Sequence, residues 1–151
     1  MDVKEAVENA EQNEDVKKLM NNTILCSCFS IQKNNLFIEW TLHYYNEKKK
    51  TITDVFVDSH GAFVGEETPA MGTETRLNIA DVIPVEEAIE LVKKKINNVI
   101  EVLVTLHKKE KILWTINFIT AGLEVYSFDI DALSKEIIVE RRESLISKQV
   151  T

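Results

Sequence analysis

The chain has 151 residues, enough for one ordinary domain or two very small ones, and its formal net charge is −7. This charge disfavours a nucleic-acid or anionic-membrane partner, because binding phosphate groups requires local positive charge. No apolar run reaches the roughly 18 residues of a membrane span. The polar, acidic N-terminus also lacks the apolar core of a signal peptide. Unless a leader has been removed, we therefore expect a cytoplasmic protein.

The two cysteines lie two residues apart on one predicted strand. Cys26 and Cys28 would face the same side, with Cα atoms about 6.5–7 Å apart, which is at or beyond the reach of a disulfide. A lone C-x-C also provides too few ligands for a structural zinc site. We interpret both as reduced core residues, and we predict no metal and no cofactor.

The first half of the chain predicts helical structure followed by strands. Residues 2–22 follow an apolar stripe of helical spacing with a polar break in the middle, so they form one helix or two short ones. Residues 23–32 are nearly continuously apolar, as in a strand covered on both faces. Residues 36–45 and 51–57 predict two more strands, and 62–64 can pair back as a short last one. The 36–45 strand places alternate apolar side chains on one face: Leu36, Ile38, Trp40, Leu42 and Tyr44.

The second half follows a similar plan after a connector rich in breaker residues. Pro84 suits the first position of a helix, and an apolar stripe continues to Ile96. A strand is predicted at 99–107. Residues 112–141 then predict three strands separated by polar turns. The first of these three directs alternate side chains to one face: Ile112, Trp114, Ile116 and Phe118.

The two halves match in the order of residue types, at an offset of about 74 residues. Trp40-Thr41 in the first half stands against Trp114-Thr115 in the second, and each pair lies in an alternating strand that follows an apolar one. We predict an α+β fold of two repeated α-β-β-β units, in which a helix covers one face of an antiparallel sheet of three or four strands. Both tryptophans should be buried. The predicted boundaries are 1–66 for the first unit, 67–83 for the connector, 84–143 for the second unit and 144–151 for a tail.

Several residues of the second unit resemble the PepSY domain. They are Val85-Glu86-Glu87-Ala88 at the helix start, then Trp114, Ile116, Gly122, Tyr126, Phe128, Ile130-Asp131-Ala132 and Ile137-Ile138. The similarity covers roughly 83–140 and, more faintly, 14–66. Ser134-Lys135 stands where the family has a Thr-Gly turn, and Asp58-Ser59 replaces the Asp-Ala of the pattern.

The PepSY resemblance implies a cystatin-like α+β fold and a non-catalytic role. Members of the family occur as inhibitory segments of secreted peptidases or as small extracytoplasmic domains. This chain carries neither a peptidase domain nor an anchor, so a role as a peptidase inhibitor is not what we expect of it.

Five polar residues are candidates for a binding surface. His43 lies on the outer face of its predicted strand with Glu39 and Thr41, an arrangement that can serve acid–base chemistry or form a solvated cross-strand pair. Asp129 and Asp131 alternate at a strand end and could bind Ca²⁺, although capping of the following turn is simpler. We assign no catalytic residue.

The sequence supports two classes of function. The first is a non-catalytic protein- or peptide-binding or regulatory module, which uses an open sheet face or a free edge strand. The strand Thr23–Ile31 is the best candidate for such an edge or for a seam between the units, and edge strands could also join copies into a homo-oligomer. The alternative is a small enzyme or ligand-binding protein with a pocket between the two units, in which His43 or Asp129 acts.

Overall fold

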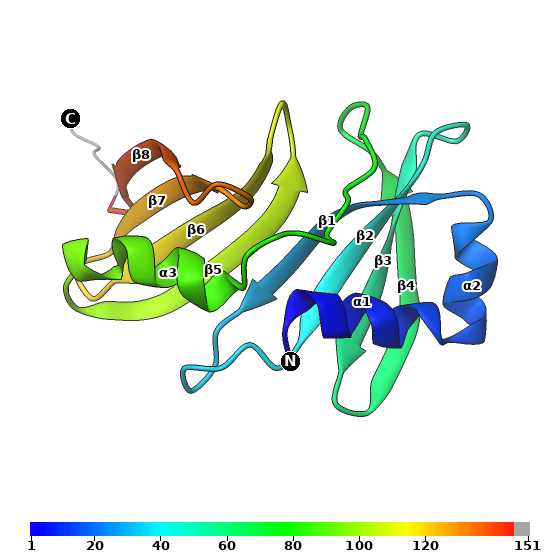
Figure 1. Ribbon diagram of the computed structural model, residues 1–151, viewed down its shortest axis with the longest axis horizontal. Helices are drawn as coiled ribbons and strands as arrows, with labels where there is room; N and C mark the ends of the chain where they lie inside the picture. Colours follow the sequence, from blue (N-terminus) through cyan, green and yellow to red (C-terminus); the bar gives the residue numbers. More distant parts are fainter. Residues whose placement is uncertain (147–151) are drawn as a thin grey trace.

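The computed structural model describes residues 1–146, which form an α+β fold with three helices and one eight-stranded antiparallel sheet (Figure 1). The helices are α1 (Val3–Glu11), α2 (Glu14–Met20) and α3 (Val85–Val92), and a short 3-10 turn, η1 (Lys93–Lys95), extends α3. The strands are β1 (Ile24–Ile31), β2 (Trp40–Asn46), β3 (Thr51–Asp58), β4 (Gly61–Pro69), β5 (Val99–Lys108), β6 (Ile112–Thr120), β7 (Glu124–Asp131) and β8 (Ile137–Ser144).

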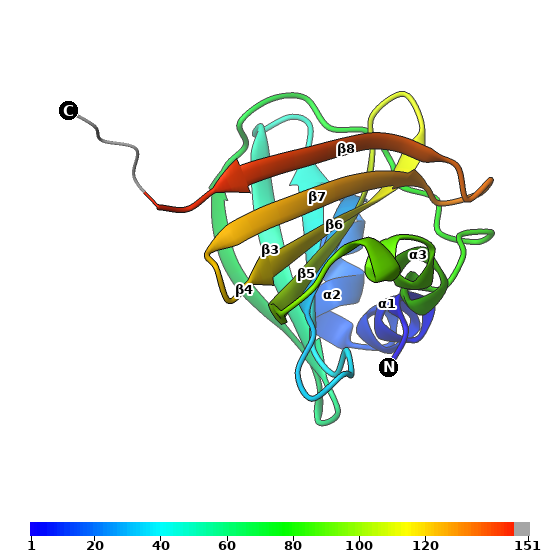
Figure 2. The same cartoon turned by 90° about the vertical axis from the view of Figure 1, so that its left-hand side faces the viewer.

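The strands lie in the order β4-β3-β2-β1-β5-β6-β7-β8. The last strand of each half, β4 or β8, is therefore at an edge of the sheet. The first strands of the two halves, β1 and β5, pair at the centre, from Ser27 opposite His107 to Ile31 opposite Leu103. The apolar run at 23–32 thus forms a seam within a single sheet, which was one of the two roles considered for it. The three helices lie on the same face of this sheet (Figures 1 and 2).

The two tryptophans lie under the helices at the centre of the core. Trp40 is 1% exposed and Trp114 is 0% exposed, and their ring centroids are 6.1 Å apart. Each indole N–H donates to the carbonyl two residues before a helix: Trp40 to Met1 at 3.0 Å and Trp114 to Ile83 at 2.9 Å. A buried indole N–H needs such an acceptor, so each bond ties a strand to the start of a helix. The predicted burial of both rings is confirmed.

The polar break in the N-terminal segment is a boundary between two helices. The side chain of Asn13 accepts hydrogen bonds from the backbone N–H groups of Asp15 and Val16, at 2.9 and 3.2 Å, and so caps the start of α2. Asp2 caps α1 in the same way by accepting from Glu5. These caps satisfy N–H groups that have no partner within the helix, and the apolar stripe of α1 then packs on the sheet.

The strand predicted at 36–45 begins only at Trp40. Leu36 is 60% exposed and Ile38 is 43% exposed, whereas Phe37 is 2% exposed. Reciprocal backbone hydrogen bonds between Lys33 and Leu36 close a tight turn, and the chain then places the Phe37 ring 6.0 Å from the Trp40 ring. The prediction that Leu36 and Ile38 share the buried face of Trp40 is therefore wrong, because residues 37–39 between the turn and β2 are not in a strand and do not continue its alternation.

The last strand of the first half is longer than its sequence pattern indicates. β4 continues to Pro69, three residues beyond the predicted unit boundary at 66, and most of its residues are exposed at the sheet edge. An edge strand with one solvated side lacks the apolar alternation on which the prediction depended. Each half of the chain contributes four strands to the sheet, which agrees with the predicted three or four. Residues 147–151 of the predicted tail lie outside the described part of the chain.

An irregularity in β1 separates the two cysteines. The pairing register with β2 shifts between Leu25 and Ser27, and an extra residue at such a bulge reverses the faces of those that follow. Cys28 belongs to the core cluster, whereas Cys26 lines a groove with Ser27 outside that cluster. The predicted shared face is wrong. Both thiols are free and buried, and burial raises the pKa of Cys26 to about 12.

Candidate binding face and groove

The sheet has a second face that none of the three helices covers (Figures 1 and 2). Its side chains alternate along each strand with those of the core and are mostly half-buried. We call it the helix-free face and define it by residues from all eight strands: Ser27, Phe29, Ile31, Thr41, His43, Asp54, Phe56, Phe63, Thr105, His107, Thr115, Asp129 and Arg141.

Three adjacent strands bring Ser27, His43 and Asp54 together on this face. Register pairs Ser27 with His43 and His43 with Asp54. The Ser27 Oγ atom is 2.7 Å from His43 Nδ1, and His43 Nε2 is 3.4 Å from Asp54 Oδ1. When the neutral imidazole carries its proton on Nε2, that N–H points toward the Asp54 carboxylate, and Nδ1 accepts a hydrogen bond from the Ser27 hydroxyl. The histidine is thus held at both of its nitrogen atoms.

A second chain of hydrogen bonds crosses the strands on the other side of the seam. Thr115 Oγ donates to Asp129 Oδ1 at 2.8 Å, so it accepts from His107 Nε2, also at 2.8 Å. Both terminal nitrogens of Arg141 donate to the Asp129 carboxylate, at 3.1 and 3.2 Å. This bidentate geometry is the stronger form of a carboxylate–guanidinium pair, and it fixes the orientation of Asp129.

The two chains meet at the centre of the sheet, where Ser27 of β1 lies directly opposite His107 of β5. Together they form a band that extends from β3 to β8. We call it the polar row and define it as Asp54, His43, Ser27, His107, Thr115, Asp129 and Arg141. Because each member has a hydrogen-bond or ion-pair partner in the row, these half-buried polar groups stay on the sheet without the cost of unsatisfied donors and acceptors.

The environment of the row shifts the pKa values of both histidines and of Asp129. Burial lowers the pKa of His43, against the opposing charges of Asp54 and Glu74. Burial and the nearby Lys109 lower the pKa of His107, against Asp129. Burial alone would raise the pKa of Asp129, but the hydrogen bonds from Arg141 and Thr115 outweigh it, so that pKa lies below its usual value. The two histidines of the row are therefore neutral near neutral pH, and Asp129 is charged.

The five candidate residues do not form one site. His43 and Asp129 both belong to the polar row, and Thr41 lies beside it on the same face. Glu39 precedes β2, is exposed, and pairs with Lys33 at 3.4 Å, so the carboxylate next to His43 is that of Asp54 instead. Asp131 accepts from the backbone N–H groups of the turn that follows it, at 2.8 and 3.0 Å. Turn capping, the simpler interpretation of Asp131, is confirmed.

Sequence reasoning missed five members of the polar row: Ser27, Asp54, His107, Thr115 and Arg141. His107, Thr115 and Arg141 each lie in a strand whose side chains alternate between the two faces of the sheet, and this alternation was a usable signal of a shared face. The sequence does not specify the strand order, which decides which strands are neighbours, or the register, which decides how far each strand is shifted against the next. Among residues 1–146, no group of three or more His, Cys, Asp or Glu side chains is arranged to hold a metal ion.

The order Ser27–His43–Asp54 has the residue types of a nucleophile, a base and an acid. Acyl transfer also needs hydrogen-bond donors aimed at the developing oxyanion. Ser27 lies within β1, which pairs with a neighbour on both sides, and interior strands use their N–H groups in the ladder. The arrangement thus places a hydroxyl, an imidazole and a carboxylate in one row on the sheet.

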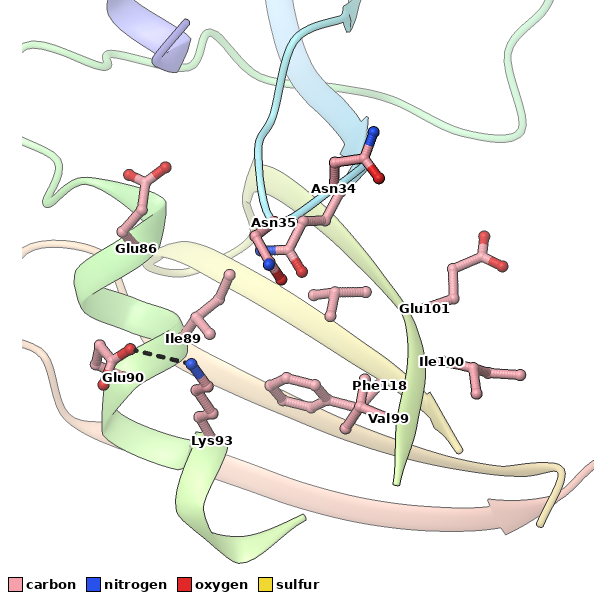
Figure 3. A pocket seen from close by; sticks show the side chains of 12 residues that line it. Asn34, Asn35, Glu86, Ile89, Glu90, Lys93, Val99, Ile100, Glu101 and Phe118 are labelled. Carbon is pink, nitrogen blue, oxygen red and sulfur yellow. Dashed lines mark ion pairs between the residues drawn. The ribbon is translucent and has the colours of Figure 1, made fainter. Parts of the chain in front are cut away.

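A separate groove lies at the other end of β1, between the two halves of the chain (Figure 3). The turn after β1 forms one wall with Asn34 and Asn35, and α3 forms the opposite wall with Glu86 and Glu90. Ile89 and parts of β5 and β6 complete the groove, whose volume is about 490 Å³. Its lining combines apolar and polar side chains, which is the usual composition of a binding site.

Comparison with solved structures finds a protein whose fold is similar to that of this chain. No family model matches the chain, and no curated protein matches it. One similar solved structure is that of a putative lipoprotein from Clostridium difficile 630, with a TM-score of 0.62 and 14% sequence identity. The match covers 84% of this chain and 87% of the other. Within residues 1–146, no helix is long and apolar enough to cross a membrane.

Proposed function

We propose that this chain is a non-catalytic binding or regulatory module that takes a protein or peptide partner on the helix-free face of its sheet. The observation that carries the proposal is the combination, on one uncovered face, of half-exposed apolar side chains with a polar row whose hydrogen bonds are already made. Such a face can bury its apolar side chains against a partner without leaving its own polar groups unpaired.

The apolar part of the face lies beside the polar row. Phe29, Thr41 and Phe56 are in register on adjacent strands, and the Phe56 ring packs 5.2 Å from that of Phe63 on β4. Phe63 is 57% exposed. Aromatic side chains are enriched where partners bind, because each buries a large area at a low cost in conformational entropy. We infer that the partner contacts this aromatic cluster and the adjacent half of the row.

The test is an affinity purification from the source cell, followed by direct measurement of binding for each protein recovered. Phe63→Ser and Thr41→Lys change the helix-free face, and Leu36→Ser is the matched control, since Leu36 is equally exposed but lies on the turn before β2. We expect the partner to bind the natural chain and Leu36→Ser, and to bind the two face variants at least about ten-fold more weakly. Equal binding to all four proteins would contradict the proposal.

We also propose that the sheet consists of two repeated units related to the PepSY domain and its cystatin-like fold. The mirrored strand order on the two sides of the seam supports this, as do the equivalent hydrogen bonds of Trp40 and Trp114. Structures of further chains from the same family would test it, because a true duplication should occur in some of them as a single helix with four strands.

The alternative is a small enzyme or ligand-binding protein with a pocket between the two units. The Ser27–His43 hydrogen bond favours the enzyme, since it joins a hydroxyl to a possible base. A fluorophosphonate probe separates the two proposals. The enzyme is supported if the probe labels Ser27 and if Ser27→Ala and His43→Gln each abolish the labelling. A natural chain that is not labelled supports the binding module.

Cytoplasmic localisation and self-association through edge strands are further parts of the proposal. Two free cysteines fit a reducing compartment, whereas the description of the similar structure as a lipoprotein points to a membrane surface. Cell fractionation decides between them. The exposed edges are β4 and β8, so a homo-oligomer formed by these strands should dissociate when a proline is placed at Arg141, in the middle of β8.

A further inference from the structure

We propose that the groove between the β1–β2 turn and α3 is a second binding site, distinct from the helix-free face, and that it takes a basic peptide segment with an apolar side chain between two basic ones. We call it the α3 groove and define it by the residues that line it: Gln32, Asn34, Asn35, Glu86, Ile89, Glu90, Lys93, Val99, Ile100, Glu101, Val102 and Phe118.

The floor of the α3 groove is apolar. Ile89, Val102 and Phe118 are 7%, 6% and 1% exposed, so only small parts of each reach solvent. Figure 3 shows Ile89 of α3 and Phe118 of β6 facing each other across this floor. They belong to the core cluster, which holds the floor rigid. An apolar side chain of a ligand would therefore meet a preformed surface and gain from leaving water.

The rim of the groove is acidic. Glu86 lies on α3 and Glu101 on β5, and in Figure 3 their side chains extend outward from the apolar floor on its two sides. Within the described residues, neither carboxylate takes part in an ion pair. Glu90 is neutralised by Lys93, whose Nζ lies 3.6 Å from it. Two uncompensated negative charges on either side of an apolar floor complement a segment with a positive side chain on each side of an apolar one.

The wall opposite α3 is suited to a peptide backbone. Asn34 and Asn35 have φ values of 51° and 64°, and the reciprocal backbone bonds of Lys33 and Leu36 close the turn around them. This is the two-residue hairpin turn in which asparagine tolerates positive φ, so both carboxamides are presented from a fixed backbone. Each carboxamide can donate to a peptide C=O and accept from a peptide N–H. A partly open groove with such a wall fits an extended chain better than a small molecule, which it could not enclose.

The experiment is an NMR titration of the full-length, isotope-labelled chain with short capped peptides. The first peptide has phenylalanine between two lysines in a Gly-Ser context, the second replaces both lysines by glutamates, and the third replaces phenylalanine by serine. We expect the first peptide to bind and to shift the resonances of Ile89, Val102 and Phe118. The second and third should bind much more weakly.

The variant Glu86→Gln/Glu101→Gln keeps the shape of the rim and removes both charges. We expect it to weaken the first peptide roughly two- to twenty-fold, because each exposed ion pair contributes little alone, and to remove most of the salt dependence of binding. Glu8→Gln/Glu66→Gln is the matched control, since both residues are exposed and lie on α1 and β4. It should bind as the natural chain does.

Three outcomes would overturn the proposal: no binding of the first peptide, equal binding of the glutamate peptide, or shifts confined to the helix-free face. The last result would leave the α3 groove without a ligand but would support the proposed function. Loss of partner binding in the Phe63→Ser variant, with the groove titration unchanged, would instead separate the two sites from each other.

Discussion

Replacing Trp114 by phenylalanine should destabilise the fold by about 2–4 kcal/mol. The smaller ring leaves part of a fully buried site unfilled, which costs about 1 kcal/mol. It also removes the indole N–H that donates to the carbonyl of Ile83 at 2.9 Å. Ile83 is only 9% exposed, and a buried acceptor left without a donor costs about 1–3 kcal/mol.

The free energy of unfolding should be measured by urea denaturation followed by circular dichroism, because the chain has only two tryptophans and each substitution would change a fluorescence signal. The m-value should stay constant, since the surface exposed on unfolding hardly changes. A double-mutant cycle with Trp40→Phe should give a coupling of about 0.5–1.5 kcal/mol for the two rings, whose centroids are 6.1 Å apart. A loss below about 1 kcal/mol, or additive effects, would refute the argument that these rings form the shared centre of the core.

Four further predictions follow from particular contacts. Because the pKa values of His43 and His107 are lowered in the folded chain, the unfolded chain binds more protons than the folded one as the pH falls below about 6.5. The free energy of unfolding should therefore decrease from about pH 7.5 to about pH 5.5, and it should decrease by less in His107→Gln. Asp129→Asn should cost about 1 kcal/mol near pH 7, since Arg141 is 44% exposed and its ion pair is partly screened; as the pKa of Asp129 is lowered, the difference should shrink as the pH falls below about 4, the ordinary pKa of the group, and disappear once the carboxylate of the folded chain is also protonated. Lys135→Gly should raise the melting temperature, because Lys135 has a φ of 71° and relief of that strain is worth about 0.5–1 kcal/mol; a lower value would show that its ion pair with Glu87 matters more. Residues 1–75 expressed alone should give the exchange-broadened spectrum of an unfolded or partly folded chain, and a dispersed one would contradict the single shared core.

The strands with strict alternation could be predicted from the sequence, and so could the side chains they bury. In β6, Trp114, Ile116 and Phe118 face the core as expected, because a period of two leaves only one way to bury an apolar face. The predictions failed where one local event changed the phase. The bulge in β1 moved Cys26 out of the core, and the non-strand segment 37–39 before β2 left Ile38 exposed.

The polar row could not be predicted as a unit, because its members come from seven strands and are brought together by register. His43 and Asp129 were recognised one at a time, each with a neighbour from its own strand as the expected partner. In the fold their partners come from other strands: Asp54 for His43, and Arg141 for Asp129. Cross-strand pairs of this kind depend on pairing that a local pattern does not specify.

The seam explains why these observations belong to one structural unit. If β1 and β5 were separated, each would become an edge strand with unpaired backbone groups and an apolar face. The same separation would break the contact between Trp40 and Trp114 and would leave Ser27 and His107 in two unconnected fragments of the polar row. Core, sheet and helix-free face therefore depend on the same five paired positions, so a substitution that weakens the seam, such as proline at Phe29, should reduce stability and partner binding together.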